Sequence, residues 1–392
     1  MTPLPVSAYT VTSALGAGRA AHLEALRTER SGLRKLDFDT NALDCWLGAV
    51  ADFDVPLTGD WQPWDCRNNR LALFALEQDG FRAAVERARA QYSRDRIGVF
   101  IGTSTSGVQQ TELAYRARDP ESQRLPDWFH HRYTQNIFSI AACVARALEL
   151  TGPAFAISTA CSSSAKVFAA ARRAIAAGTC DAALVGGVDS LCLTTLYGFN
   201  SLQLVSADIC RPADAARGGI SIGEAAGFAL LEPTSDAPVA LLGYGETSDA
   251  YHMSSPDPEG HGAAASMQAA LASAGLPATA IDYINLHGTG TMANDSSEAR
   301  AVCTVFGTSL PCSSTKGWTG HTLGAAGIVE SALALLCIEH GLMPRSLNTR
   351  TQDPNIDAAI LLENRSAAVR NVMSNSFGFG GSNCTLLFGQ RA

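Results

Sequence analysis

The chain has 392 residues, of which 46% are hydrophobic and 17% charged, and its formal net charge is −8. A chain of this length and composition can bury a sizeable core, which excludes a largely disordered protein. The acidic net charge argues against nucleic acid as a partner, because phosphates bind to basic surfaces.

The N-terminal region and the cysteines predict a cytoplasmic protein. Residues 1–18 lack a basic segment followed by an apolar one, and no stretch approaches the roughly 20 apolar residues of a membrane span. The eleven cysteines are scattered without a Cys-x-x-Cys pair. We therefore expect reduced thiols, no disulfide framework, no metal site and no membrane anchor.

Strand-like runs alternate with alanine-rich helical stretches along the chain. The runs lie at 97–107, 154–164, 182–190, 281–291 and 310–317. Small residues follow each run, and helices are expected after Cys161, ending at Gly178, and over 324–340. This alternation predicts an α/β protein with buried strands.

Two segments repeat the same order of features. Residues 157–174 and 312–336 each run from a strand through a Ser/Thr-rich turn into a helix of small residues. Two related halves would explain this similarity, although it does not demonstrate duplication by itself. The proline-bearing stretch from Glu232 to Pro238 is the expected boundary, which divides the chain into 1–238 and 239–392.

Cys161 follows an apolar run and precedes a helical one. At a helix N-terminus, unpaired backbone N–H groups and the positive end of the helix dipole favour an anion. This position predicts a lowered thiol pKa, so Cys161 is the thiol best placed to act as a nucleophile. The alternative is a small buried thiol that packs under the turn, and the local sequence does not decide between the two.

Two histidines also stand at turns between strands and helices. His287 ends a strand and is followed by Gly288 and Gly290, which let backbone approach a ligand closely. His321 comes five residues after Lys316, again between a strand and a helix. An isolated histidine is more often structural than catalytic, but three such side chains at one end of a sheet support one another as a site.

The segment 375–383, NSFGFGGSN, is rich in glycine. Its glycines permit positive φ angles and can turn backbone N–H groups into a concave surface, as in an oxyanion hole. A glycine-rich turn that closes a final hairpin is the alternative. The segment is not a phosphate loop, because no Gly-Lys-Ser/Thr follows.

These motifs together resemble the β-ketoacyl carrier-protein synthases I and II of the thiolase superfamily. The resemblance is carried by TACSSS around Cys161, HGTGT from His287, STKG with Lys316, GHTLGAAG with His321, and the closing NSFGFGGSN. Similar segments at 13–34, 211–227 and 249–260 extend it over nearly the whole chain in the right order. The ordered set is strongly specific, whereas a single motif would be weak.

The resemblance implies a fold and a reaction. The fold is the α/β thiolase fold, in which two similar βαβαβαββ halves stack in α-β-α-β-α layers, usually as a dimer. Cys161 would take the acyl group, and His287 with His321 would stabilise the enolate formed when a malonyl thioester loses carbon dioxide. Lys316 would support the histidines, with Glu330 as its carboxylate partner. An ordinary helix acid is the alternative for Glu330.

The same resemblance assigns further site residues. The backbone N–H groups of Cys161 and Phe379 would form the oxyanion hole. The oxyanion loop and the gate beside it would comprise Phe379, Gly380, Asp249 and His252. The pantetheine arm would contact Thr289 and Thr291, and the acyl pocket would include Thr105 and Phe199.

The resemblance also implies partners. An acyl carrier protein would supply the phosphopantetheine arm, so no bound cofactor is expected. The dimer would be a homodimer, or a heterodimer with a chain-length-factor-like homologue. The stretch 186–206, together with HGTGTMAND and NSFGFGGSN, looks more like ketosynthases of aryl-polyene pigment clusters than like housekeeping fatty-acid enzymes.

The chain departs from the family pattern at several positions. Ala213 and Gly218 replace an aromatic residue and an acid, and Asn294 stands where glycine is usual. Thr105 and Gln203 stand where an apolar gate and a basic docking residue are common. Acyl-chain length and carrier identity are therefore open. Contact with the carrier is one interpretation of Arg67 and Arg70, and a solvated helix face is the other.

Four other classes of protein were compared with these features. A biosynthetic thiolase has a second catalytic cysteine in a C-terminal Cys-x-Gly segment, where this chain has GFGGSN. A type III synthase has asparagine where this chain has His321, and a chain-length factor lacks the nucleophile. Nothing beyond the cysteine and histidines supports a Cys-His hydrolase.

Overall fold

The computed structural model describes residues 1–391 and contains two halves of the same topology. The first half contains β1 (Leu4–Ser13), α3 (Phe81–Tyr92), β4 (Ile97–Gly102), α5 (Ser139–Ala147), β5 (Ala154–Ile157), α6 (Ser163–Ala176), β6 (Ala182–Asp189) and β8 (Ala225–Leu231). The second contains β9 (Val239–Ser248), α8 (His261–Ala274), β10 (Tyr283–Asn285), α9 (Met292–Phe306), β11 (Cys312–Ser313), α11 (Ala326–His340), β14 (Asn371–Gly378) and β15 (Ser382–Gln390). Each half is thus a βαβαβαββ unit. The expected boundary at 238 lies between β8 and β9.

The strands of the two halves are arranged in the same order. The orders are β5-β4-β6-β8-β1 and β11-β10-β14-β15-β9. In the first half β4 is parallel to β5 and β6, and β8 is antiparallel to β6 and β1. In the second, β10 is parallel to β11 and β14, and β15 is antiparallel to β14 and β9. This equivalence confirms the predicted thiolase fold.

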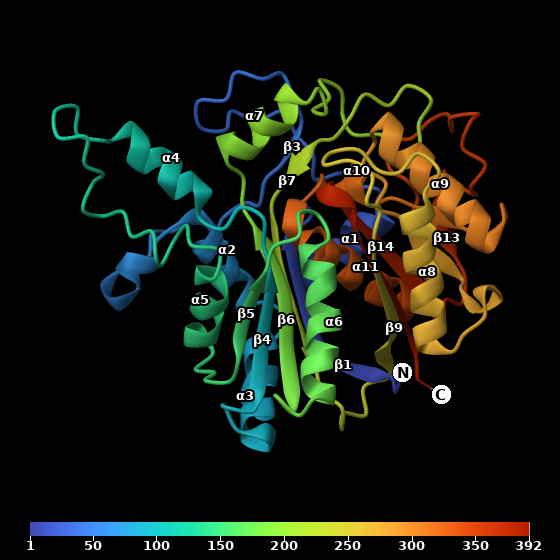
Figure 1. Cartoon of the computed structure of the whole chain (residues 1–392), viewed down its shortest axis with the longest axis horizontal. Helices are drawn as coiled ribbons and strands as arrows, with labels where there is room; N and C mark the ends of the chain where they lie inside the picture. The colour runs from blue at the N-terminus through green and yellow to red at the C-terminus, as the bar shows by residue number, and fades with distance from the viewer. Residues whose placement is uncertain (392) are drawn as a thin grey trace.

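Three hydrophobic clusters lie between the layers of the fold and pack them together. The first joins α2 (Arg67–Leu76), α3 and α5 to β4, β6 and β8. The second surrounds α6 and α11 between the two sets of strands, and the third joins α8 and α9 to β10 and β14. Helices therefore cover both outer faces and also fill the middle of the molecule (Figure 1). This is the predicted α-β-α-β-α order.

The central helix α11 is enclosed by protein. The segment Leu323–His340 has a mean hydropathy of 1.5 over 18 residues, long and apolar enough by composition alone to cross a membrane, which differs from the sequence expectation. However, 89% of it is buried inside the protein. It packs against α6 and against strands of both halves. A helix that contacts protein on all sides is apolar all round, which explains this composition.

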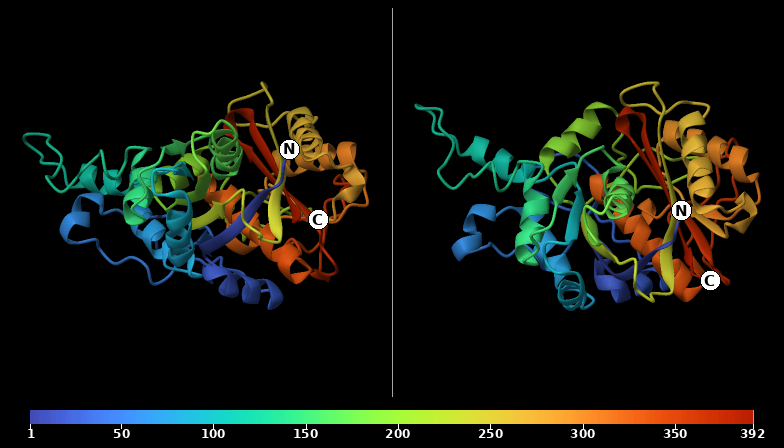
Figure 2. Two further views of the ribbon diagram at one scale, coloured as in Figure 1. Left: turned by 90° about the horizontal axis from the view of Figure 1, so that it is seen from below. Right: turned by 60° about the horizontal axis from the view of Figure 1, so that its bottom comes forward.

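Shorter elements frame these halves. The remaining helices are α1 (Gly18–Arg27), α4 (Val108–Arg116), α7 (Leu193–Ser201) and α10 (Lys316–Thr319), with 3-10 turns η1 (Gly59–Trp64), η2 (Ala278–Ala280), η3 (Leu323–Ala325) and η4 (Phe379–Gly381). The remaining strands are β2 (Gly16–Ala17), β3 (Leu47–Gly48), β7 (Ile222–Gly223), β12 (Leu342–Met343) and β13 (Arg365–Ser366). Helix α4 and the connection that follows it project from the body in Figures 1 and 2.

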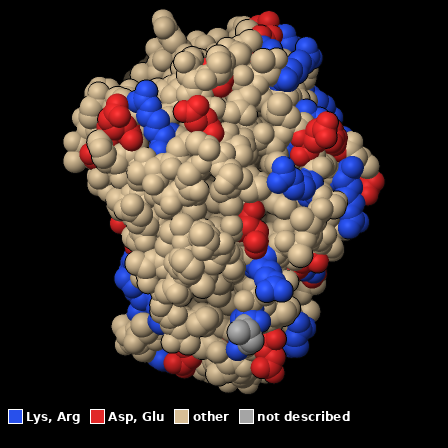
Figure 3. Space-filling model, turned by 90° about the vertical axis from the view of Figure 1, so that its right-hand side faces the viewer, with Lys and Arg blue, Asp and Glu red and all other residues tan. Residues whose placement is uncertain are grey.

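The surface is uneven in polarity. Strand β5 is an edge strand of the sheet, and its Phe155 side chain is 48% exposed. On the face turned toward the viewer in Figure 3, uncharged atoms cover much of the left and centre, and charged side chains lie at the upper left, along the right side and at the bottom. Both signs of charge are mixed on this face, so it offers no continuous basic surface for nucleic acid.

Candidate active site

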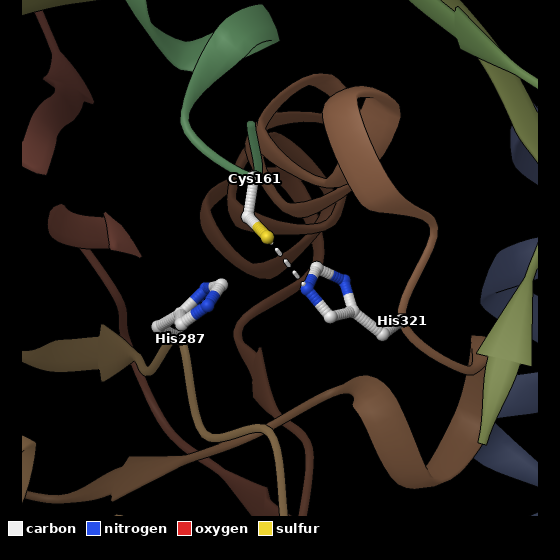
Figure 4. Close-up of side chains that lie close together, drawn as sticks. All are labelled: Cys161, His287 and His321. Atoms are coloured by element: carbon white, nitrogen blue, oxygen red, sulfur yellow. Dashed lines mark hydrogen bonds between the residues drawn. The ribbon is translucent and has the colours of Figure 1, made fainter. Parts of the chain in front are cut away.

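Cys161, His287 and His321 come together from loops that follow strands in both halves of the chain (Figure 4). Cys161 follows β5, His287 follows β10, and His321 follows β11 and α10. Nε2 of His321 lies 3.0 Å from Sγ of Cys161, and one ligand atom from each residue lies within 4.8 Å of the others. All three are buried. The structure therefore groups the three side chains that the sequence placed at one end of the sheet.

Strained backbone stands beside two of these side chains. Ala160, just before Cys161, has φ 51°, and Leu323, two residues after His321, has φ 56°. Residues other than glycine adopt such angles only where surrounding contacts hold them. The Ala160 carbonyl accepts hydrogen bonds from the hydroxyls of Ser104 (3.2 Å) and Ser163 (2.5 Å). The sharp bend places Cys161 between the end of β5 and the start of α6.

Both imidazoles carry their proton on Nε2. The Leu323 N–H donates to Nδ1 of His321 (3.3 Å), and Nζ of Lys316 donates to Nδ1 of His287 (3.3 Å). A ring nitrogen that accepts a hydrogen bond bears no proton, so the neutral ring is protonated on the other nitrogen. Burial, and then the charge of Lys316, lower the pKa of both histidines well below 6.5. The site therefore holds two neutral N–H donors.

Lys316 and Glu330 form a buried ion pair behind His287. The Lys316 ammonium donates to Glu330 and to the carbonyl oxygen of His287. Burial raises the pKa of Glu330 to about 7, and Lys316 acts against this rise. The Ser376 hydroxyl also donates to Glu330 (3.5 Å). Glu330 is thus bonded to the lysine that supports His287, not placed on a solvated helix face.

The predicted lowering of the Cys161 pKa is wrong. Burial raises the pKa of this thiol to about 11, and the opposing effects of Lys316 and of the Phe379 N–H are smaller. Cys161 also precedes Ser162, the N-cap of α6, and so lies outside the first turn in which the helix dipole acts most strongly. The thiol is therefore protonated at neutral pH.

The glycine-rich segment 375–383 forms the hairpin turn that its sequence allowed, and this turn lies beside Cys161. Strands β14 and β15 form a hairpin joined by η4, in which Gly380 has φ 80°. The Phe379 N–H lies near enough to the Cys161 sulfur to lower the pKa of the thiol. A Cβ at Gly378 would lie 3.2 Å from the Cys161 backbone nitrogen, so glycine allows this close approach. The hairpin turn therefore also supplies an N–H donor beside the thiol.

A cavity of about 110 Å³ opens beside the three side chains. Its walls include these residues singled out from the sequence: Cys161, Phe199, Asp249, His287, Thr289, Thr291, Asn294, His321 and Phe379. The hydroxyls of Thr289 and Thr291 are 2.9 Å apart, and the rings of Phe199 and Phe379 are 5.5 Å apart. Asp249 accepts a hydrogen bond from Asn383 (2.6 Å).

Other expected residues lie outside the cavity wall. His252 is exposed, and its Nδ1 accepts a hydrogen bond from the Ser254 N–H (3.2 Å). Thr105 is buried, and its hydroxyl donates to Asp189 (2.8 Å). Gly380 lies in the hairpin turn, where its N–H donates to the Met253 carbonyl (2.8 Å). The structure therefore brings Phe199, but not Thr105, to the cavity.

Several known proteins are similar to this chain in sequence and in fold. Residues 68–237 match the N-terminal domain of β-ketoacyl synthases, and residues 239–350 match the C-terminal domain. Nodulation protein E of Rhizobium meliloti (strain 1021) is 37% identical over 75% of this chain and 76% of its own length. The 3-oxoacyl-[acyl-carrier-protein] synthase 2 of the same strain is 32% identical over 99% of this chain and 98% of its own. The chain belongs to the β-ketoacyl synthase family.

A solved complex from this family has the same fold. One chain of the complex between the ketosynthase ApeO and its chain length factor ApeC, from Xenorhabdus doucetiae, has a TM-score of 0.92 and 39% identity. The alignment covers 99% of this chain and 98% of that one. Membership of the β-ketoacyl synthase family makes the chain an acyltransferase that forms carbon–carbon bonds by condensation.

Two buried acids near this β-ketoacyl synthase site were not predicted from the sequence. Glu298 of α9 accepts hydrogen bonds from the backbone N–H groups of His287 (2.8 Å) and Gly288 (2.7 Å), and from the Asn375 side chain (3.1 Å). It holds the loop that carries His287, yet in the sequence it resembles any other helix acid. Asp189 at the end of β6 is a second buried acid without a sequence signal.

Arg67 and Arg70 do not lie on a solvated helix face. Arg67 pairs with Glu224 (2.6 Å) and Asp54 (2.8 Å), and Arg70 pairs with Asp65 (2.6 Å) and Asp54 (2.8 Å). Their side chains are only 12% and 16% exposed. Both arginines therefore tie α2 to neighbouring segments, which corrects the interpretation as a solvated helix face. Contact with an acyl carrier stays a prediction.

The same three side chains are close enough to be considered as metal ligands. Cys161, His287 and His321 are a sulfur and two imidazoles within 4.8 Å of one another. A neutral histidine that binds a metal through Nε2 carries its proton on Nδ1 and donates from there. In both histidines Nδ1 instead accepts a hydrogen bond, from Lys316 or Leu323. This arrangement suits N–H donation by Nε2 better than metal ligation.

Proposed function

We propose that the chain is a β-ketoacyl-[acyl carrier protein] synthase that condenses a malonyl unit with an acyl group held on Cys161. The observation that carries the proposal is the pair of neutral imidazoles, His287 and His321, beside one buried thiol. Two N–H donors in one cavity stabilise an oxyanion. A hydrolase with one general-base histidine does not need this pair.

In the first half-reaction the sulfur of Cys161 attacks the thioester carbonyl of an acyl carrier. The new carbon–sulfur bond forms as the bond to the pantetheine sulfur breaks, and the thiol proton leaves on the pantetheine sulfur. The Cys161 and Phe379 N–H groups would hold the carbonyl oxygen. The proximity of the Phe379 N–H to the sulfur supports this role.

In the second half-reaction the malonyl thioester oxygen accepts hydrogen bonds from His287 and His321. The malonyl carboxylate leaves as carbon dioxide, and its electron pair enters the enolate. The enolate carbon attacks the acyl carbonyl on Cys161, and the cysteine sulfur departs and takes up a proton. The Lys316 ammonium donates a hydrogen bond to Nδ1 of His287. The proton of this imidazole therefore stays on Nε2, from which it is donated to the enolate oxygen.

The cavity fits the delivery of both substrates on a phosphopantetheine arm. Thr289 and Thr291 line the approach to Cys161 and can bond the amides of such an arm. The arm belongs to the acyl carrier protein, so the chain itself needs no bound cofactor. We place this reaction in the cytoplasm.

A second subunit would cover the exposed edge of the first half. Phe155 of β5 is 48% exposed at the end of the strand order, where another strand can pair. A chain length factor accompanies ApeO in the solved complex. A catalytically inactive homologue or a second copy would fill the same place, and this chain would supply the intact cysteine and histidines.

The pathway is proposed to be the synthesis of an aryl-polyene-type pigment. Identity to a chain of the ApeO–ApeC complex is 39%, compared with 32% to the 3-oxoacyl synthase 2 of Rhizobium meliloti. This difference supports a dedicated ketosynthase over a housekeeping one.

Mass spectrometry of the intact protein tests this function. The protein is incubated with saturated and polyunsaturated acyl carriers and with malonyl carrier. We expect one acyl adduct on Cys161, extension to a β-ketoacyl product, and preference for polyunsaturated chains. Preference for saturated chains would contradict the pigment assignment. The absence of any acyl adduct would contradict the proposed enzymatic activity.

A further inference from the structure

Asp189 is a fully buried carboxylate beside the active site. It is the last residue of β6 and has 0% exposure. One oxygen, Oδ1, accepts hydrogen bonds from the Thr103 hydroxyl (2.6 Å) and from the N–H (2.8 Å) and hydroxyl (2.8 Å) of Thr105. The Ser104 N–H lies 2.9 Å from both oxygens. Its donors are all hydroxyl or backbone groups. Burial raises the pKa of this carboxyl, and the hydrogen bonds from Thr103, Thr105 and Ser104 act against the rise.

The second oxygen of Asp189 connects the two halves of the chain. Oδ2 accepts a hydrogen bond from the Gly324 N–H (2.5 Å) in η3 of the second half. Residues 103–105 belong to the first half, directly after β4. A Cβ added to Gly324 would lie 2.6 Å from Oδ2, so the two groups approach as closely as glycine permits. Asp189 therefore fixes Gly324 against the 103–105 loop.

Gly324 adjoins the residue that sets the proton position of His321. Leu323 has φ 56°, and its N–H donates to Nδ1 of His321 (3.3 Å). This conformation is strained for leucine and persists only when neighbouring contacts impose it. The bond from Gly324 to Asp189 is such a contact, because it anchors the peptide that follows Leu323.

We propose that Asp189 is a positioning residue that keeps the proton of His321 on Nε2. It does so by anchoring Gly324, which holds the Leu323 N–H against Nδ1. The inference rests on the proposed condensation for its consequence in catalysis, but the tautomer itself is independent of any substrate. His321 then donates from Nε2 whenever a thioester oxygen enters the cavity.

The substitution Asp189→Asn separates this role from simple packing. Oδ1 has more donors than Oδ2, so the amide oxygen stays at Oδ1 and the NH₂ group faces the Gly324 N–H. Two donors then oppose each other, and the Gly324 anchor is lost. The Leu323 N–H moves from Nδ1, and the His321 proton redistributes between the ring nitrogens.

Nitrogen-15 NMR of histidine-labelled protein measures the tautomer directly, because protonated and unprotonated ring nitrogens resonate far apart. The His321 signals are identified by their loss in His321→Gln. We expect Nε2 protonation in the natural protein and a mixed or Nδ1-protonated ring in Asp189→Asn. A natural protein with Nδ1-protonated His321 would overturn the proposal without any variant, so a poorly folding variant leaves it testable.

Two matched controls accompany this measurement. Thr105→Val removes one donor from Oδ1 and keeps Oδ2 with Gly324, so the His321 tautomer should be unchanged. Asp353→Asn removes a buried carboxylate that pairs with Arg217 (2.7 Å), and it should lower stability without altering His321. A folded Asp189→Asn protein with the natural tautomer, or a changed tautomer in Asp353→Asn, would contradict the role given to Asp189.

The kinetic test follows the two half-reactions. In Asp189→Asn, malonyl decarboxylation should fall at least about tenfold, since a misplaced oxyanion donor loses much of its effect. Acylation of Cys161 should fall less. Equal losses in both half-reactions would argue against a role through His321. A protein inactive in both reactions but with the expected tautomers would refute the proposed function and leave the positioning role intact.

Discussion

Lys316 and Glu330 are bonded to each other with side chains only 1% and 3% exposed, and the same lysine touches both the carbonyl oxygen and Nδ1 of His287. The charge pair is therefore part of the support of an imidazole. Its burial makes the cost of removing one partner large, because the other would remain without a counter-charge.

Lys316→Met should lower the free energy of unfolding by about 3 kcal/mol, the usual cost of breaking a buried pair. The double variant Lys316→Met with Glu330→Met should recover much of that stability, because no buried charge is left unpaired. It should not recover condensation, since His287 still lacks its Nδ1 donor. Denaturant titration and product formation measure the two effects. Recovery of activity in the double variant would show that Lys316 does not act through His287.

Cys161→Ala should abolish acyl loading and leave the fold unchanged. The side chain is small and alanine fills most of its volume, so thermal unfolding should shift little. Malonyl decarboxylation should persist, because His287 and His321 provide the donors for the enolate oxygen. Intact-protein mass spectrometry and carbon dioxide release separate the two activities. Loading on another of the buried cysteines would contradict the assignment of the nucleophile.

His321→Ala should impair malonyl decarboxylation more than acyl transfer to Cys161. Loss of one oxyanion donor typically costs about 100-fold to 1,000-fold in rate, whereas the Cys161 and Phe379 N–H groups remain for acyl transfer. Stopped assays of each half-reaction on the same preparation provide the comparison. A similar loss in both would remove the proposed division of labour.

Glu298 should make the protein less stable as the pH rises through 7. Burial raises the pKa of Glu298 from 4.5 to about 7, against the hydrogen bonds from Gly288 and His287. The native protein therefore keeps a proton that the unfolded chain has already released between these values. Its stabilising contribution is fully present below the unfolded pKa and is lost as the pH passes the folded pKa.

The free energy of unfolding of the natural protein should therefore fall relative to that of Glu298→Gln as the pH rises from 4.5 to about 7, by about 3 kcal/mol at most. Asp353→Asn is the control of opposite sign, because hydrogen bonds from Asn355 and then Arg217 lower the pKa of Asp353. Its natural carboxylate loses its stabilising contribution as the pH falls. A pH-independent difference for Glu298→Gln would contradict the raised pKa.

The candidate side chains and the alternation of strands and helices could be predicted from residues that are neighbours in the chain. Cys161, His287 and His321 each lie in a short motif at the end of a strand, and this local pattern marked all three as site candidates. The packing of the two halves then brings Cys161, after β5, to the histidines after β10 and β11. The alternation of strands and helices follows from local patterns, because each pattern specifies a strand, a turn or a helix over a few residues. The βαβαβαββ order was implied by the family resemblance. These features depend on neighbours in the chain, which any single sequence displays.

The charge states and the supporting contacts could not be predicted in this way. The raised pKa of Cys161, the Nε2 protons of the two histidines, and the roles of Glu298 and Asp189 depend on burial and on hydrogen-bond partners far away in the sequence. Asp189 and Gly324, for instance, are separated by 135 residues. The free energy of a charge is set by its surroundings in space, which a motif does not describe.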